Sequence, residues 1–135
     1  MSRNIDPAVS SDEESAARFI HAARHFRQPR AARFTAMVGI GGRRLLLKIE
    51  NGAVASIDNL ASLRPLAAWD FSVTADADAW LRFWEALPAA GWHDIFALTR
   101  HGRMCIEGNL HPFMAHLQFV KDLLASPRTE GSEHA

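Results

Sequence analysis

The stretch that decides the fold is WDFSVTADADAWLRFWEAL, residues 69–87, because its hydrophobic period changes once along its length. Its first half alternates Trp69, Phe71 and Val73 with polar residues, which predicts a strand with one buried face. Its second half repeats apolar side chains every three or four residues, which predicts a helix over 77–87 capped by Thr74 or Asp76. The apolar face of this helix consists of Trp80, Phe83, Trp84 and Leu87.

Trp92 and Phe96 add two large aromatic side chains just beyond a corner that contains Pro88 and Gly91. Aromatic side chains carry more apolar area than most others, so their concentration indicates the centre of a core or the wall of an apolar binding site. The segment after the corner, WHDIFALTRHG, is expected to be a short helix or irregular.

Before the decisive stretch, three extended segments joined by very short loops predict an antiparallel meander. The segments are FTAMVGI, RLLLKIE and AVASID, linked by Gly41-Gly42 and Asn51-Gly52. These dipeptides tolerate the positive φ of two-residue turns. Such turns would pair Ile40 with Arg43 and Glu50 with Ala53.

This register places a set of apolar side chains on one face of the sheet. They are Phe34, Ala36, Val38, Leu45, Leu47, Ile49 and Val54. The opposite face is mostly polar but carries Leu46 and Ile57. One face is therefore expected to meet the core and the other to meet water.

Two further helices are expected at the ends of the domain, over 11–27 and 109–125. The first buries Phe19 and Ala23 and turns Arg18, His21 and His25 to solvent. The last, which follows a short strand at 103–107, has an apolar stripe over more than half its circumference. A stripe this wide needs a second contact: a neighbouring subunit, another helix or a bound apolar molecule.

Composition limits the classes of function. The 135 residues are 48% hydrophobic, and the 15 basic and 15 acidic side chains give a formal net charge of zero. These values fit one globular domain with no general attraction to nucleic acid. We expect a flexible N-terminus over 1–10, the domain over 11–125 and a disordered tail over 126–135. The single cysteine and the absence of a recognisable signal peptide or membrane span predict a cytoplasmic location.

Three stretches resemble the sterol carrier protein 2 (SCP-2-like) family: LLLKIENGAVASID, WDFSVTADADAWLRFWEAL and HGRMCIEGNLHPFMAHLQFVKDLL. The resemblance implies an α+β fold, with a mainly antiparallel, twisted, five-stranded sheet covered by helices. It also implies an apolar tunnel that takes acyl chains, sterols or other lipids. The expected function is non-catalytic binding or transfer of a lipid or other small hydrophobic molecule, without a cofactor.

The resemblance and the aromatic corner together imply a set of ligand-binding side chains. They are Trp80, Phe83, Trp84, Leu87, Trp92, Ile95, Phe96, Phe113, Met114 and Leu117. A polar headgroup is expected near His93, Arg100 or His101. The alternative is an accessory module that forms a homodimer or docks on a partner enzyme through the same apolar surface.

Polar side chains give weaker signals. His93, Asp94 and His101 are the best acid–base candidates, but adjacent side chains rarely form an oriented dyad, so His93 and Asp94 are expected to cap a short helix or line the pocket mouth. Cys105 is expected to be buried and unreactive. No catalytic residue and no metal site are therefore expected.

Four arginines lie between the first helix and the first strand: Arg24, Arg27, Arg30 and Arg33. The simpler interpretation of this cluster is a charged, solvated surface. The functional interpretation is transient contact with anionic headgroups of a membrane.

Overall fold

The computed structural model describes residues 7–60 and 69–128. The elements follow in this order: α1 (Pro7–His25), β1 (Arg33–Ile40), β2 (Arg43–Glu50), β3 (Ala53–Leu60), β4 (Phe71–Ala75), α2 (Ala77–Phe83), α3 (Ile95–Arg100), β5 (Cys105–Gly108), α4 (Leu110–Ala115), α5 (Leu117–Leu124) and the 3-10 helix η1 (Ser126–Arg128). Helix α1 begins before the predicted Ser11, and the chain stays ordered past the predicted boundary at Ala125. Residues 1–6 and 129–135 of the predicted flexible ends lie outside the described residues.

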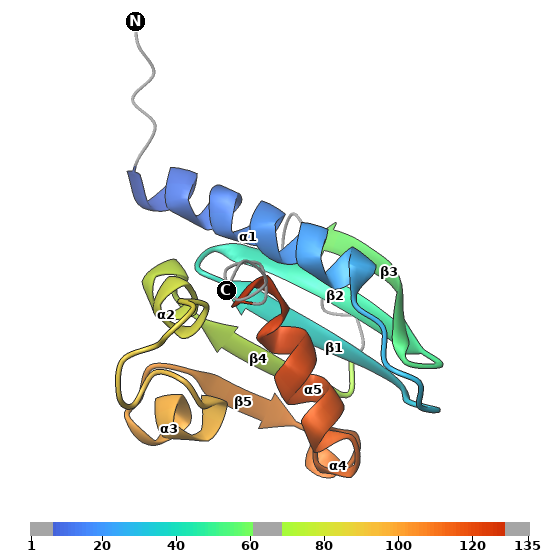
Figure 1. The fold of residues 1–135 in the computed structure, drawn as a ribbon. Coiled ribbons are helices and arrows are strands. Elements are labelled where there is room, and N and C mark those ends of the chain that lie inside the picture. Colours follow the sequence, from blue (N-terminus) through green and yellow to red (C-terminus); the bar gives the residue numbers. More distant parts are fainter. Residues whose placement is uncertain (1–6, 61–68, 129–135) are drawn as a thin grey trace, which may run out of the picture.

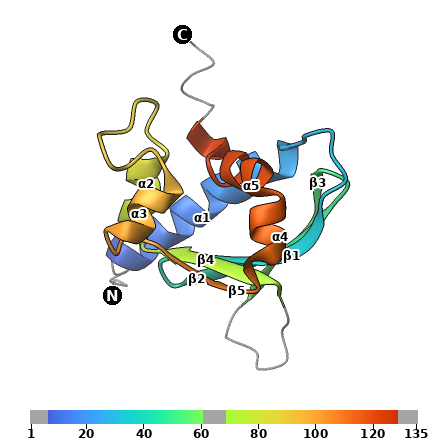
Figure 2. The same ribbon diagram turned by 90° about the horizontal axis from the view of Figure 1, so that it is seen from below.

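The five strands form one sheet in the order β3-β2-β1-β4-β5 (Figure 1). Strands β1 and β4 run parallel, and the other three pairs are antiparallel. The sheet is thus mixed, although mainly antiparallel as the sequence predicts. Figure 2 shows the helices gathered on one face of this sheet. The α+β fold class is confirmed.

The two hairpins have the predicted register. Ile40 pairs with Arg43 across the first turn, and Glu50 pairs with Ala53 across the second. The second turn needs positive φ at both central positions, 52° at Asn51 and 77° at Gly52. A side chain at Gly52 would also collide with the carbonyl oxygen of Gln28, 1.8 Å from the position of a Cβ atom.

A β-bulge between β2 and β3 makes one sequence prediction wrong. Ile49 pairs with Val54, but Lys48 pairs with Ser56, so β3 has an extra residue at this point. The shift brings Ile57 opposite Leu47, where it is partly buried and packs against the core. Ile57 therefore lies on the inner face, not on the polar face that strict alternation predicts.

Helix α2 begins where the sequence predicts and ends earlier. The Asp76 carboxylate accepts a hydrogen bond from the backbone N–H of Ala79 at 2.8 Å and so caps the start. The helix ends at Phe83, whose carbonyl oxygen accepts hydrogen bonds from the Arg128 guanidinium, through Nε at 2.9 Å and through a second nitrogen. That oxygen would otherwise bond the amide of Leu87. The predicted helix over 77–87 is therefore wrong beyond Phe83.

The predicted last helix is two helices, α4 and α5, separated at His116, where φ is −121° and ψ is 37°. In one straight helix Phe113 and Phe119 would point about 120° apart. The break lets both enter the core, where Phe113 meets Phe71 at 5.3 Å and Phe119 meets Phe34 at 6.1 Å between ring centroids. The wide apolar stripe is thus largely satisfied within the domain.

Two buried indoles tie α2 to its surroundings. Trp80 is fully buried and donates a hydrogen bond from Nε1 to the Gly39 carbonyl of β1 at 2.9 Å. Trp84 is 1% exposed and donates from Nε1 to the Leu124 carbonyl of α5 at 2.8 Å. Arg18 lies over the Trp84 ring at 5.4 Å and donates to the Pro127 carbonyl, so it is half-buried and not on a solvent face as predicted. These contacts join strand, helices and C-terminal turn at one point.

Trp80→Phe should lower the free energy of unfolding by about 2 kcal/mol, because it removes buried apolar volume and leaves the Gly39 carbonyl without this donor. Urea denaturation measures the change. Trp92→Phe is the matched control, since Trp92 is only partly buried, and it should cost less than about 1 kcal/mol. Equal losses in the two variants would contradict the role given to the Trp80 hydrogen bond.

Candidate functional site

The space between the sheet and the helices is filled by aromatic rings that touch in a chain. Phe34 and Phe71 are 5.4 Å apart between ring centroids, Phe71 and Phe113 are 5.3 Å apart, and Phe113 and Phe96 are 6.1 Å apart. On the α2 side, Trp80 and Trp84 approach to 5.5 Å. This aromatic layer is the apolar interior of the protein.

The residues predicted to bind a ligand occupy three different environments. Five are buried in this layer: Trp80, Phe83, Trp84, Ile95 and Phe113. Trp92, Phe96 and Leu117 are partly buried and pack at its border. Leu87 is 90% exposed and Met114 is 54% exposed. The structure thus brings most of the predicted set together, places Leu87 on a surface loop, and places Met114 on the outer side of α4.

Helix α4 is the helix with the least anchoring in the core. Phe113 is its one buried side chain, whereas Leu110 is 41% exposed and Met114 is exposed. Its neighbour Phe96 on α3 is only partly buried, and the Lys121 ammonium group lies 5.6 Å from the Phe96 ring centroid. If α4 moved away from the core, Phe113 would therefore be the main side chain to lose its burial.

A polar cleft of about 420 Å³ lies between the segment that follows α2 and helix α5. Its lining consists of Phe83, His93, Asp94, Ile95, Gln118, Lys121, Asp122, Ala125 and Arg128. Lys121 forms an ion pair with Asp94 at 3.1 Å. Burial lowers the pKa of the Arg128 guanidinium from its ordinary value. This cleft combines cations, an imidazole and carboxylates next to the aromatic layer.

The polar candidates are placed partly as predicted. His93 and Asp94 both line the cleft. Asp94 also holds the N-cap position of α3, but its side chain forms the ion pair with Lys121 and makes no cap hydrogen bond. Arg100 and His101 are exposed at the end of α3. Within residues 7–60 and 69–128, no group of three or more His, Cys, Asp or Glu side chains could hold a metal ion.

Cys105 is exposed, so the prediction that it is buried is wrong. Strand β5 is at the edge of the sheet, and Cys105 occupies the face of β5 that the helices leave uncovered. The Cys105 thiol donates a hydrogen bond to the Glu107 carboxylate, and this bond, with lesser contributions from burial and the carboxylate charge, raises the pKa of Cys105. A raised pKa disfavours the thiolate, so this thiol is a poor nucleophile at neutral pH.

Sequence reasoning missed a hollow on the uncovered face of the sheet, with a volume of about 490 Å³. Its lining includes Met37, Arg44, Trp69, Ser72 and Thr74. Trp69 was predicted to share the inner face with Phe71, but β4 begins at Phe71, so strand alternation does not extend back to Trp69. A tryptophan two residues before the strand was the available signal.

No model of a known protein family matches the chain, and no curated protein matches it either. Solved structures do match. A crystal structure of sterol carrier protein 2 gives a TM-score of 0.61 at 15% identity, over 85% of this chain and 94% of the other. Sterol carrier protein 2 like 2 from Aedes aegypti gives 0.55 at 15%, over 81% and 94%. The ubiquinone synthesis protein UbiJ-SCP2 gives 0.50 at 14%, over 93% and 98%.

The chain therefore has the sterol carrier protein 2 fold, and the resemblance stated from the sequence is confirmed at the level of the fold. In the described part of the chain, no helix is long and apolar enough to cross a membrane.

Glu107→Gln should make Cys105 react faster with iodoacetamide at neutral pH, because loss of the carboxylate lowers the thiol pKa and increases the thiolate fraction. The alkylation rate, followed by mass spectrometry, measures the effect. In urea the two unfolded chains should react at similar rates. A folded variant that reacts no faster than the original protein would contradict the assignment of the pKa shift to Glu107.

Proposed function

We propose that this protein binds a lipid or another small hydrophobic molecule in its apolar interior and catalyses no reaction on it. The observation that carries the proposal is the aromatic layer between the sheet and helices α2 to α5, within a fold shared with sterol carrier protein 2. An acyl chain, a sterol or a quinone tail would gain free energy by burial against these rings.

Helix α4 is the proposed gate to the interior. Phe113 contacts both Phe71 and Phe96, so its withdrawal would open a path from the exposed side of α4 to the aromatic layer. Met114 lies next to Phe113, exposed on that helix, and would contact the ligand as it enters. Exposed apolar side chains at such a point would shield an entering apolar chain from water, which is favourable.

The cleft between the post-α2 segment and α5 is the proposed location of the polar headgroup. Lys121 and His93 can donate hydrogen bonds there, next to the buried side chains of Phe83 and Ile95. An amphiphile could then bury its apolar part and keep its polar end in contact with water. The name of UbiJ-SCP2, a ubiquinone synthesis protein, adds isoprenoid quinones to the cargo classes worth testing.

The second candidate is an accessory module that dimerises or docks on an enzyme. Leu110 and Met114, both exposed on α4, favour it, because a partner could bury them. The mass in solution separates the carrier from the homodimeric form of this candidate. An obligate homodimer has twice the mass of the 15.0 kDa chain at every practical concentration, whereas the carrier is expected to be a monomer.

Met114→Asp should weaken binding of a fluorescent fatty acid, NBD-stearate, by about tenfold or more, because it places a charge on the entry path of the acyl chain. Since Met114 is exposed, the free energy of unfolding should change by less than about 0.5 kcal/mol. Titration of the probe with urea denaturation of the same samples measures both quantities.

Ala115→Asp is the matched control for that experiment. Ala115 is the next residue of α4, is also exposed, and points to a different side of the helix, so the substitution adds the same charge off the proposed path. Affinity should stay within about twofold of the original value. Equal affinity in all three proteins would remove α4 as the gate, and failure of the original protein to bind acyl, sterol and quinone probes would refute the carrier.

A further inference from the structure

The loop between α2 and α3 presents a small apolar tip to solvent. Leu87 is 90% exposed, the most exposed of the large hydrophobic side chains that the structure describes. Ala86, Ala89 and Ala90 around it are also exposed. Between Trp84 and Trp92 the sequence has one charged residue, Glu85, near the start of the loop. Transfer of an apolar tip of this kind from water to an apolar phase lowers the free energy.

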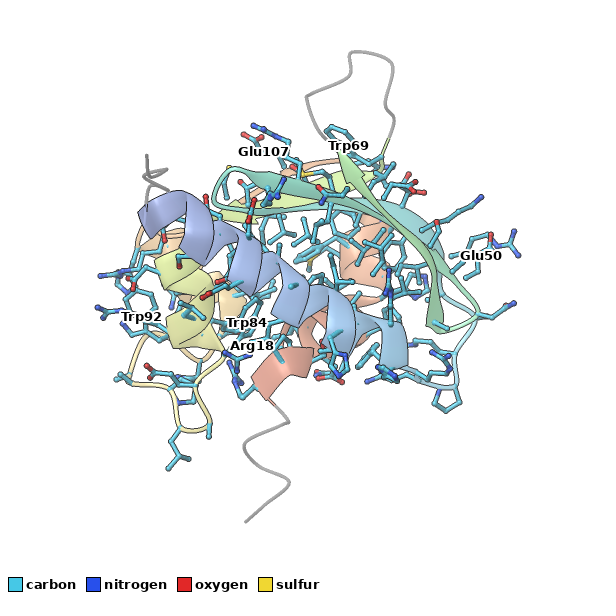
Figure 3. The ribbon with its side chains drawn as sticks, turned by 90° about the horizontal axis from the view of Figure 1, so that it is seen from above. Arg18, Glu50, Trp69, Trp84, Trp92 and Glu107 are labelled. Carbon is cyan, nitrogen blue, oxygen red and sulfur yellow. The ribbon has the colours of Figure 1, made fainter. Side chains whose placement is uncertain are left out.

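The base of this loop carries two positive charges on one aromatic ring. The guanidinium carbon of Arg82 lies 5.0 Å from the Trp92 ring centroid, and that of Arg103 lies 4.5 Å from the same centroid. The Arg82 and Arg103 side chains are exposed. Figure 3 shows Trp92 at the edge of the molecule, whereas Trp84 lies beneath α1. Cation–π contact holds both guanidinium groups in place without neutralising them.

The charge balance at this ring is positive. Arg82 forms an ion pair with Asp78 at 3.2 Å. Arg103 has no acidic partner among the described residues. One guanidinium thus remains free to bind an anion from solution, next to a second cation and below an apolar tip.

An anionic lipid bilayer matches this arrangement better than a protein surface does. Trp and Arg side chains are favoured at the headgroup level of membranes, and an apolar tip reaches the acyl chains just beneath it. A stable protein interface needs about 20 to 30 residues on each side. The loop offers one large exposed apolar side chain, Leu87, which is too little for the core of such an interface.

The four-arginine cluster is a weaker candidate for membrane contact. Arg24, Arg27, Arg30 and Arg33 are exposed, but none of the large exposed hydrophobic side chains described lies among them. The cluster extends from the last turn of α1 to the first residue of β1, at the end of the molecule opposite the α2–α3 loop in Figures 1 and 2. The two surfaces therefore cannot both face one flat bilayer. Mutations in each surface can test its contribution to membrane binding independently.

We propose that the loop over 85–91, together with Arg82, Trp92 and Arg103, docks the protein on anionic membranes. Leu87 enters the acyl region, Trp92 lies at the headgroup level, and the two arginines bind the headgroup anions. The docking concerns the surface alone, so it holds whether or not the interior takes up a lipid.

Co-sedimentation with sucrose-loaded vesicles tests this docking with the full chain. Vesicles of phosphatidylcholine alone and of phosphatidylcholine with phosphatidylserine are compared. The protein should bind the second kind, Leu87→Ser should weaken that binding by about tenfold, and Arg103→Gln by about fivefold. High salt should abolish the difference made by Arg103→Gln and preserve that made by Leu87→Ser.

Two control variants make the result decisive. Leu110→Ser removes another exposed leucine, on α4, and Arg24→Gln with Arg27→Gln removes two exposed arginines of the cluster. Both should bind within about twofold of the original protein. Stronger loss in the arginine control than in Arg103→Gln would overturn the assignment to the loop. Absence of binding to both kinds of vesicle would overturn membrane docking and leave a protein contact as the role of Leu87.

Discussion

The packing of helices on the sheet depends on two buried indole N–H groups, one in α2 and one at its C-cap. Trp80 bonds the Gly39 carbonyl of β1, and Trp84 bonds the Leu124 carbonyl at the end of α5. A buried indole without an acceptor is costly, so each bond sets the distance between α2 and one partner. The same helix is closed by Arg128, which bonds the Phe83 carbonyl and lies over its ring at 4.6 Å. One short helix thus joins the sheet to the C-terminal end of the described chain.

This constraint also explains the arrangement of the aromatic side chains. Trp80 and Trp84 are held by hydrogen bonds, whereas at the other end of the layer Phe96 is only partly buried and contacts Phe113. Phe113 is held by a six-residue helix that buries no other side chain. The side of α3 and α4 is therefore the one at which we propose that the interior opens.

Local patterns in the sequence predict the elements whose causes are local. The Asn51-Gly52 turn, the Asp76 cap and the pairing of β1 with β2 depend on neighbouring residues, and all three are present. Other features depend on distant partners. The end of α2 needs Arg128, and the break at His116 follows from the competing demands of Phe71 and Phe34 for different faces of one helix. Neither is visible in a window of a few residues.

The candidate site was likewise predictable where local periodicity determines it and unpredictable where distant partners do. Periodicity identified the aromatic residues that form the layer, because burial follows from it. It could not separate Leu87 from Trp84, since the early end of α2 removes Leu87 from the helix face and places it on the loop. The partners of Asp94 and Trp92 are likewise long-range, Lys121 and Arg103 respectively, and no sequence spacing indicates them.

Native mass spectrometry of the purified protein, followed by solvent extraction, tests binding in the interior most directly. The account predicts a monomer of 15.0 kDa that carries about one lipid, quinone or sterol-like molecule per chain, or that takes one up when such molecules are added. An empty protein that stays empty with acyl, sterol and quinone ligands would contradict it, most clearly if the mass were that of a dimer at every concentration.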